Sequence, residues 1–218
     1  MTTPIKETLF ADPAPAERLE RAAAALTAHG FTVEILDDAA AARTRVQELI
    51  PEGTCVFTGA SETLRLSGIE ADINASGRYQ AVRPRVLAMD RGTQADEIRQ
   101  LTASPDVVMG SVAAVTETGS LVVASASGSQ LPAYSGGAAR AIWIAGAQKV
   151  VPDLSTALRR VEEHCLPLES ARARDGRQGL NYAIYHDRYQ RTGDGWKFTE
   201  RVYEVRYLDT TPLAGSAP

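Results

Sequence analysis

The sequence is poor in the side chains that bind metals or form disulfides. Its 218 residues include two cysteines, Cys55 and Cys165, and three histidines, His29, His164 and His186. Two cysteines cannot supply the four thiolates of a typical iron–sulfur cluster, and no CxxC or HxxxH spacing indicates a zinc site. We therefore expect no metal, no resident cofactor, no disulfide framework, and a cytoplasmic location with reduced thiols.

Lysine is also scarce, with three residues against 20 arginines, and the formal net charge is −4. This balance argues against nucleic-acid binding, which normally needs a basic surface. No apolar run approaches the roughly 18–20 residues of a membrane helix, so we expect no contact with a membrane. Any chemistry then falls on carboxylates, hydroxyls, arginines or backbone amides.

The residues that are present, 44% of them hydrophobic, predict a normal core built from alternating helices and strands. Apolar residues at helical spacing, with their capping residues, predict helices over 14–28, 38–50, 93–101 and 153–172, and one beginning at Ser61. Short apolar runs predict strands over 31–36, 54–58, 85–89, 106–109, 121–124 and 141–145. This order is typical of an α/β fold, with an open, mostly parallel sheet flanked by helices.

The composition changes towards the C-terminus, where residues 181–208 hold seven of the thirteen aromatic residues. Gly193–Gly195 is a turn signal between two β-prone runs and predicts an antiparallel β-hairpin. We therefore divide the chain into a leader (1–13), an α/β domain (14–172) and a hairpin with its tail (173–218). The hairpin either covers an edge of the same domain or pairs with another subunit in a homo-oligomer.

The first candidate binding segment follows the predicted strand 54–58. Ligands of α/β sheets bind beyond the carboxyl ends of the strands, where backbone N–H groups at a helix start attract anions. The ligand-binding candidates here are Gly59, Ser61, Glu62 and Thr63. The alternative is that Ser61 only caps a helix.

The second candidate segment surrounds Glu117, a lone carboxylate in an apolar and hydroxyl-rich run. A carboxylate in such surroundings needs hydrogen bonds or a raised pKa, which makes it a candidate nucleophile or acid–base group. The alternative is a structural carboxylate that fixes the turn. Neighbouring ligand-binding candidates are Gly110, Ser111, Thr118 and Gly119.

The third candidate segment is a loop rich in glycine and serine, which could form the opposite wall of the same cleft. Its candidates are Ser125 and Gly128, together with Arg140, whose guanidinium suits a carboxylate or phosphate. The alternative is a surface connection without a ligand.

Three stretches resemble the LUD-domain (lactate utilisation) family, in its cluster-free, single-domain type. They are Thr58–Thr63, the run Val107–Val123 with its Glu117-Thr-Gly turn, and Trp143–Leu158. The resemblance covers residues 14–170 and implies a fold related to CoA transferases and sugar-phosphate isomerases. It also implies a role in L-lactate oxidation beside iron–sulfur partner proteins. The last forty residues depart from the family's usual ending.

Three hypotheses follow. The first is an accessory protein or subunit of organic-acid oxidation that binds a small anionic metabolite around Glu117. The second is a CoA-transferase-like or isomerase-like enzyme with Glu117 as nucleophile or base. The third is a structural adaptor that uses the C-terminal hairpin.

Overall fold

A computed structural model describes residues 10–125, 127–172, 180–192 and 195–209. The chain divides into two compact units, Met1–Leu166 and Pro167–Pro218. Most of the predicted leader, the start of the predicted C-terminal segment, its turn and its tail lie outside the described residues.

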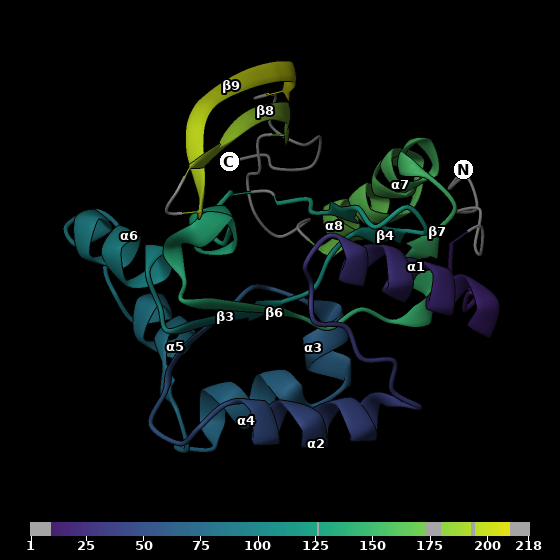
Figure 1. Ribbon diagram of the computed structural model, residues 1–218. Coiled ribbons are helices and arrows are strands. Elements are labelled where there is room, and N and C mark those ends of the chain that lie inside the picture. Colours follow the sequence, from purple (N-terminus) through teal and green to yellow (C-terminus); the bar gives the residue numbers. More distant parts are fainter. Residues whose placement is uncertain (1–9, 126, 173–179, 193–194, 210–218) are drawn as a thin grey trace, which may run out of the picture. The chain divides into compact units, whose positions relative to one another are not determined.

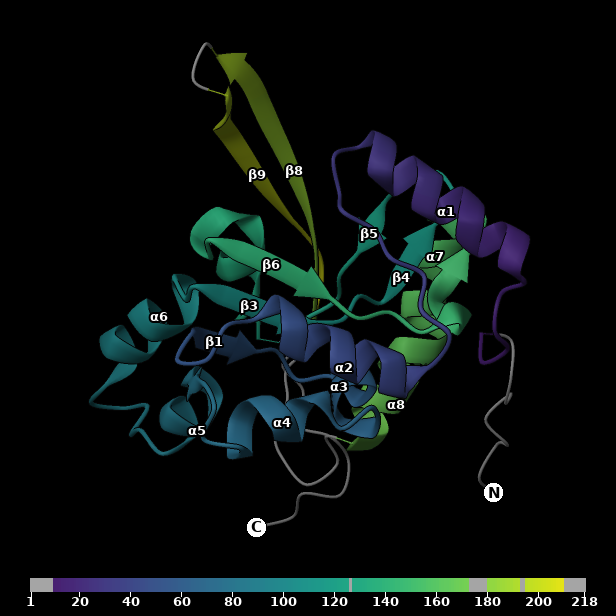
Figure 2. The same ribbon diagram turned by 60° about the horizontal axis from the view of Figure 1, so that its bottom comes forward.

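The first unit is built on a four-stranded parallel sheet in the order β2-β1-β3-β6. Figure 1 labels β3 and β6, and Figure 2 shows β1, β3 and β6 side by side. The strands are Cys55–Thr58 (β1), Gln80–Ala81 (β2), Val107–Gly110 (β3) and Arg140–Trp143 (β6). The α/β class and the mostly parallel sheet are therefore as predicted from the sequence.

Helices cover both faces of this sheet. Val56, Val107 and Met109 point to one face, where they pack against Ala39–Leu49 (α2), Glu62–Leu66 (α3) and Ile69–Ala75 (α4). Phe57 and Val108 alternate with them and point to the other face, towards Val82–Leu87 (α5), Ala95–Ala103 (α6) and the π-helical turn Ala133–Gly137 (η1). Because both faces are buried, these strands are almost entirely apolar.

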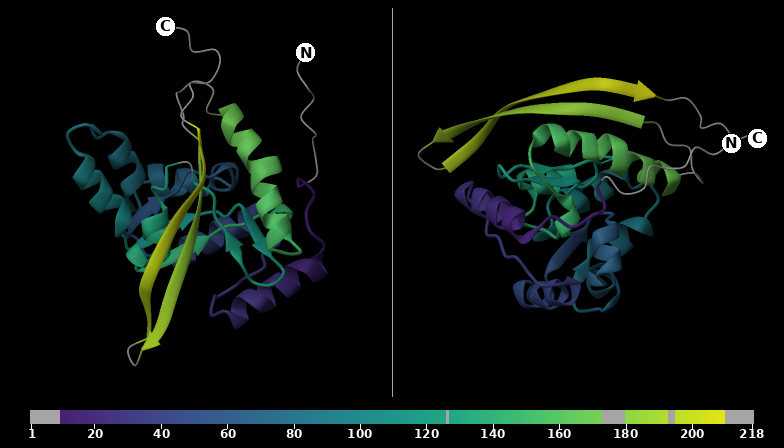
Figure 3. Two further views of the ribbon diagram at one scale, coloured as in Figure 1. Left: turned by 90° about the horizontal axis from the view of Figure 1, so that it is seen from above. Right: turned by 90° about the vertical axis from the view of Figure 1, so that its right-hand side faces the viewer.

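A second, three-stranded sheet continues the first unit, in the order β5-β4-β7. Its strands are Ala114–Thr116 (β4), Leu121–Val122 (β5) and Val150–Val151 (β7), the last preceded by the 3-10 turn Ala147–Lys149 (η2). Ala16–Ala28 (α1) packs on one face and Leu154–Arg160 (α7) on the other (Figure 3). Residues 111–113 therefore link two sheets that are each covered on both sides.

Several helix starts follow the predicted capping chemistry. The side chain of Asp38 accepts from Ala41 N at the start of α2, and that of Asp153 accepts from Thr156 N at the start of α7. The predicted helix over 153–172 is observed as α7, the π-helical segment Val161–Cys165 (η3) and Leu166–Arg172 (α8). These aspartates satisfy backbone donors that no helical carbonyl reaches.

Two predicted strands are wrong. Residues 31–36 form no strand: Phe31 and Val33 pack on the core beneath α1, but the segment pairs with no neighbouring strand. Residues 85–89 lie largely in α5, because Val82 and Val86 are four residues apart and bury one helical face against the sheet. Pro84 is tolerated because it falls in the first turn of that helix.

The second unit contains an antiparallel pair, Leu180–Thr192 (β8) and Gly195–Asp209 (β9). Tyr182 pairs with Tyr207 and Tyr185 with Tyr203, and the register shifts at two places along the pair. Among the residues placed by the structure, no helix combines the length and the apolarity needed to cross a membrane.

The turn between β4 and β5 generates a prediction about Gly119. This glycine has a φ of +83°, and a Cβ atom there would lie 2.8 Å from both the Ala25 carbonyl carbon and His29 Nδ1. Gly30 is a matched control, because its φ is +90° but nothing lies within 4 Å of its Cβ position. Gly30→Ala should cost about 1–2 kcal/mol from backbone strain alone.

Gly119→Ala should cost about 1–3 kcal/mol more than the control, because it adds overpacking against α1. Urea unfolding of both variants measures the difference. Equal destabilisation of the two variants would contradict the close packing of this turn on α1.

Candidate ligand-binding site

The carboxyl ends of β1, β3 and β6 meet at one edge of the main sheet. Gly59 follows β1 and donates its N–H to Met109 O, and Ile144 follows β6 and donates to Gly110 O, both at 2.9 Å. Ser111 follows β3 and donates its hydroxyl to Ile144 O at 2.6 Å. This is the edge at which α/β proteins bind their ligands.

Lys149 brings a positive charge to this edge. Its Nζ donates to Ser111 Oγ at 2.7 Å and to Val112 O at 2.9 Å, and Thr63 Oγ1 lies 3.5 Å from the same serine hydroxyl. Burial lowers the pKa of Lys149 to about 8, and the charge of Arg160 acts in the same direction. The residue as a whole is nevertheless partly exposed.

Arg160 is a second cation beside Lys149. It is 3% exposed, and it donates to Ala113 O and, at 3.2 Å, to Cys165 Sγ. Burial lowers the pKa of His164, and the charges of Arg160 and Lys149 lower it further. In the part of the chain that the structure describes, neither Lys149 nor Arg160 forms an ion pair with a carboxylate.

Tyr134 closes the same edge between β1 and β3. A Cβ atom added at Gly59 would lie 3.3 Å from Tyr134 Oη. A Cβ atom added at Gly110 would lie only 1.7 Å from the same oxygen. Burial raises the pKa of Tyr134 to about 12, so its hydroxyl stays protonated at neutral pH. Gly110 is therefore required for the close approach of this ring, which also packs against Trp143 with centroids 5.4 Å apart.

The structure brings four of the predicted ligand-binding residues to this edge: Gly59, Thr63, Gly110 and Ser111. Ser125 and Gly128 are connected to this edge indirectly, through Gln130. Ser125 Oγ donates to Gln130 Oε1, and the side chain of Gln130 lies next to Gly59. Gly128 N in turn donates to Ser125 Oγ.

Two further candidates from the first segment have local partners. Ser61 Oγ accepts from Leu64 N at 3.3 Å and so caps α3. Glu62 is exposed and forms an ion pair with Arg65 one turn later, at 2.7 Å. Glu62 therefore adds a charge to the surface of α3.

Glu117 lies elsewhere, in the turn between β4 and β5. Its Oε1 is 2.6 Å from Arg18 Nε and its Oε2 is 2.6 Å from Arg21 Nε, with 15% of its side chain exposed. Thr118 bonds to Thr116 through their hydroxyls, and Gly119 O bonds to His29 Nδ1. Glu117 and Ser111 lie at opposite ends of β4, so the structure does not bring them together.

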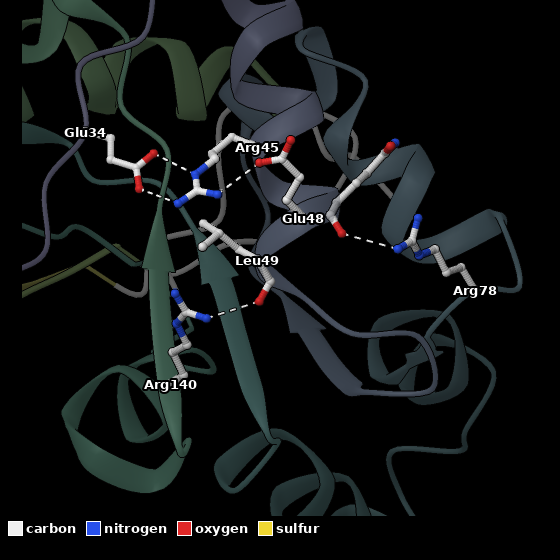
Figure 4. A network of polar contacts seen from close by, with 7 residues as sticks. Glu34, Arg45, Glu48, Leu49, Arg78 and Arg140 are labelled. Carbon is white, nitrogen blue, oxygen red and sulfur yellow. Dashed lines mark hydrogen bonds and ion pairs between the residues drawn. The ribbon is translucent and has the colours of Figure 1, made fainter.

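Arg140 begins β6 and therefore lies at the opposite, amino-terminal edge of the main sheet. Its guanidinium donates to Leu49 O at the end of α2 (Figure 4). Beside it, Arg45 bridges Glu34 and Glu48 at 2.7 and 2.9 Å. Arg140 thus belongs to a network that joins α2 to the sheet, away from Lys149.

Sequence reasoning did not single out Lys149, Tyr134 or Arg160. The signal for Lys149 was present: it is one of three lysines and stands directly before the apolar pair Val150-Val151. Tyr134 is likewise the one aromatic residue in the loop 125–137. Arg160 carried no comparable signal, because arginine is abundant in this chain.

The fold and this edge define a class: an α/β protein whose parallel strands end beside hydroxyl groups and a partly buried lysine. The model of the LUD domain matches residues 19–199, and the chain belongs to that family. The match extends into the aromatic C-terminal segment, beyond the limit at residue 170 expected from the resemblance. A search of curated proteins gave no match.

The contact of Tyr134 with Gly110 generates a double-variant prediction. Gly110→Ala should displace the tyrosine ring and destabilise the fold by about 1–3 kcal/mol, as overpacking does. Adding Tyr134→Phe removes the Oη atom that lies 1.7 Å from the new Cβ atom and leaves Cζ, which lies 3.0 Å from it. The second substitution should therefore recover part of the lost stability. The test is urea unfolding of both single variants and the double variant. Purely additive losses would contradict the contact.

The lowered pKa of Lys149 predicts a pH dependence of stability. The pKa of Lys149 is about 8 in the folded protein and about 10.4 in the unfolded chain. Between these two pH values the unfolded state therefore binds more protons than the folded state. The protein should gain stability, relative to Lys149→Met, as the pH rises from about 8 to about 10. Thermal unfolding of both proteins across this range measures the difference. A constant difference would show that Lys149 keeps an ordinary pKa.

Proposed function

We propose that this LUD-domain protein takes part in organic-acid oxidation of the L-lactate type by binding a small carboxylate beside Lys149. It would work in the cytoplasm with iron–sulfur partner proteins, which would carry the electrons on clusters that the two cysteines of this chain cannot hold. The proposal moves the anion site from Glu117 to the carboxyl edge of the main sheet.

The observation that carries the proposal is the electrostatic state of Lys149. Its two described acceptors, Ser111 Oγ and Val112 O, are both neutral, so its charge is hydrogen-bonded but not balanced. A partly buried charge without a counter-ion is costly, and a carboxylate in contact with it offsets that cost. An ammonium group has three N–H donors, and the third would bind a carboxylate oxygen.

Neighbouring groups suit the same ligand. Thr63 Oγ1 lies 3.5 Å from Ser111 Oγ, which itself accepts from Lys149, and the positive charge of Arg160 acts on Lys149. Hydroxyls and fixed cations are the groups that stabilise a carboxylate in a partly desolvated site.

The surroundings of Glu117 favour a structural role for that residue. The two arginines that could hold an external anion there are already in contact with its own carboxylate. As a nucleophile towards a thioester, Glu117 would first have to break one of these ion pairs. Its pairing with Arg18 and Arg21 instead attaches α1 to the turn between β4 and β5.

Isothermal titration with L-lactate and with pyruvate tests the site. Lys149→Met should weaken binding by about 10–100-fold, the equivalent of losing a charged hydrogen bond of about 1.5–3 kcal/mol. Arg140→Gln is the matched control at the opposite edge of the sheet and should bind as the parent protein does.

The variant Glu117→Gln distinguishes an anion site beside Lys149 from one around Glu117. It should leave binding of both acids unchanged while lowering stability, which thermal unfolding records. Unchanged binding in Lys149→Met, or loss of binding in a folded Glu117→Gln protein, would overturn the proposal.

A further inference from the structure

We infer that the preferred ligand is a 2-oxo acid of the pyruvate type, and that Lys149 Nζ bonds covalently to its carbonyl carbon as an imine. This inference rests on the proposed function for the location of the site. It goes further in naming the substrate class and in giving Lys149 a nucleophilic role in addition to its charge.

The hydrogen bonds of Lys149 are compatible with a neutral amine as well as with the ammonium group. A neutral amine has two N–H donors and one lone pair, and the structure provides two acceptors, Ser111 Oγ at 2.7 Å and Val112 O at 2.9 Å. With both donors engaged, the lone pair remains for an electrophile. The two bonds also hold the nitrogen at the edge where β3 ends, so the nucleophile is positioned before the ligand arrives.

Burial and the charge of Arg160 favour the neutral form of Lys149, whereas Cys165 acts in the opposite direction. Arg160 is 3% exposed and remains a cation, and its charge opposes a second positive charge nearby. Lysines that are desolvated or placed beside another cation are the ones that attack carbonyl groups. With a pKa of about 8, roughly a tenth of Lys149 is neutral at pH 7, against roughly 0.04% for an ordinary lysine.

The reaction balances without any further reactant. The Nζ lone pair forms a bond to C2 of the 2-oxo acid, and one N–H proton is transferred to the carbonyl oxygen to give a carbinolamine. The nitrogen then loses its second proton, the C–O bond breaks, and the oxygen takes up that proton and leaves as water. The product is an imine that keeps the ligand's carboxylate. L-lactate has no carbonyl group and can only form the ion pair.

Reductive trapping tests this step in the full-length protein. The protein is incubated with pyruvate and sodium cyanoborohydride near pH 7, digested and mapped by mass spectrometry. The reduced imine adds one 1-carboxyethyl group to a lysine. Lys6 and Lys197 are the other lysines of the chain and serve as internal references.

We expect labelling of Lys149 to exceed that of Lys6 and Lys197 by about tenfold or more, because far more of its amine is neutral at this pH. Excess L-lactate should reduce the labelling by competing for the same site. The Lys149→Met protein should show only the background at the other two lysines.

Equal labelling of the three lysines, or no labelling, would overturn the inference. The titrations described above keep this failure distinct from failure of the proposed function. If both acids bind through Lys149 and no adduct forms, the site is a carboxylate site without imine chemistry. If neither acid binds and no adduct forms, both the proposal and the inference are wrong.

Discussion

Coverage of both sheets on both faces is the constraint on which the rest of the structure depends. Because helices bury the two faces of β1 and β3, polar groups on these strands can gather only where the strands end. The two ends are used differently. The amino-terminal edge carries Arg140, whose guanidinium fastens β6 to α2, and the carboxyl edge carries Ser111 and Lys149. The location of the candidate site thus follows from how the sheet is buried.

The buried charges follow two different patterns. Glu117 is balanced by Arg18 and Arg21, a closed arrangement that holds α1 to the second sheet. Lys149 and Arg160 instead donate to consecutive carbonyls, Val112 O and Ala113 O, in the link between the two sheets. Carbonyl dipoles satisfy these donors but do not cancel their charge. The first pattern is complete within the chain, whereas the second has no carboxylate partner among the described residues, which is why we propose that an external anion binds there.

Much of the fold could be predicted from the sequence because local rules and tertiary packing agree. The apolar runs of β1 and β3 are what a strand buried on both faces requires, and Asp38 and Asp153 cap their helices through local contacts. The strand predicted over residues 31–36 is not formed because alternation of apolar and polar residues describes only an extended segment, whereas a strand also needs a neighbouring strand with free backbone groups. Whether such a neighbour exists depends on the whole fold and cannot be read from these six residues.

The candidate site was predicted in part for a similar reason. Gly59, Gly110 and Ser111 follow apolar strands, and strand ends can be recognised locally. The position of Glu117 depended on which end of β4 faces the main sheet, and the sequence does not record this. A lone carboxylate in an apolar run is equally compatible with a site and with an internal ion pair, and here the partners lie 96 and 99 residues earlier in the chain.

The chemistry of Lys149 is best understood against the composition of the chain. Arginine outnumbers lysine 20 to three, so a cation needed only for its charge would most often be arginine. A guanidinium would also bind a carboxylate more tightly, through two parallel hydrogen bonds. What arginine cannot do in a protein is lose its proton, and so it offers no lone pair. A lysine beside the buried Arg160, with acceptors for two N–H groups, is therefore compatible with the proposed neutral amine as well as with a role for its charge.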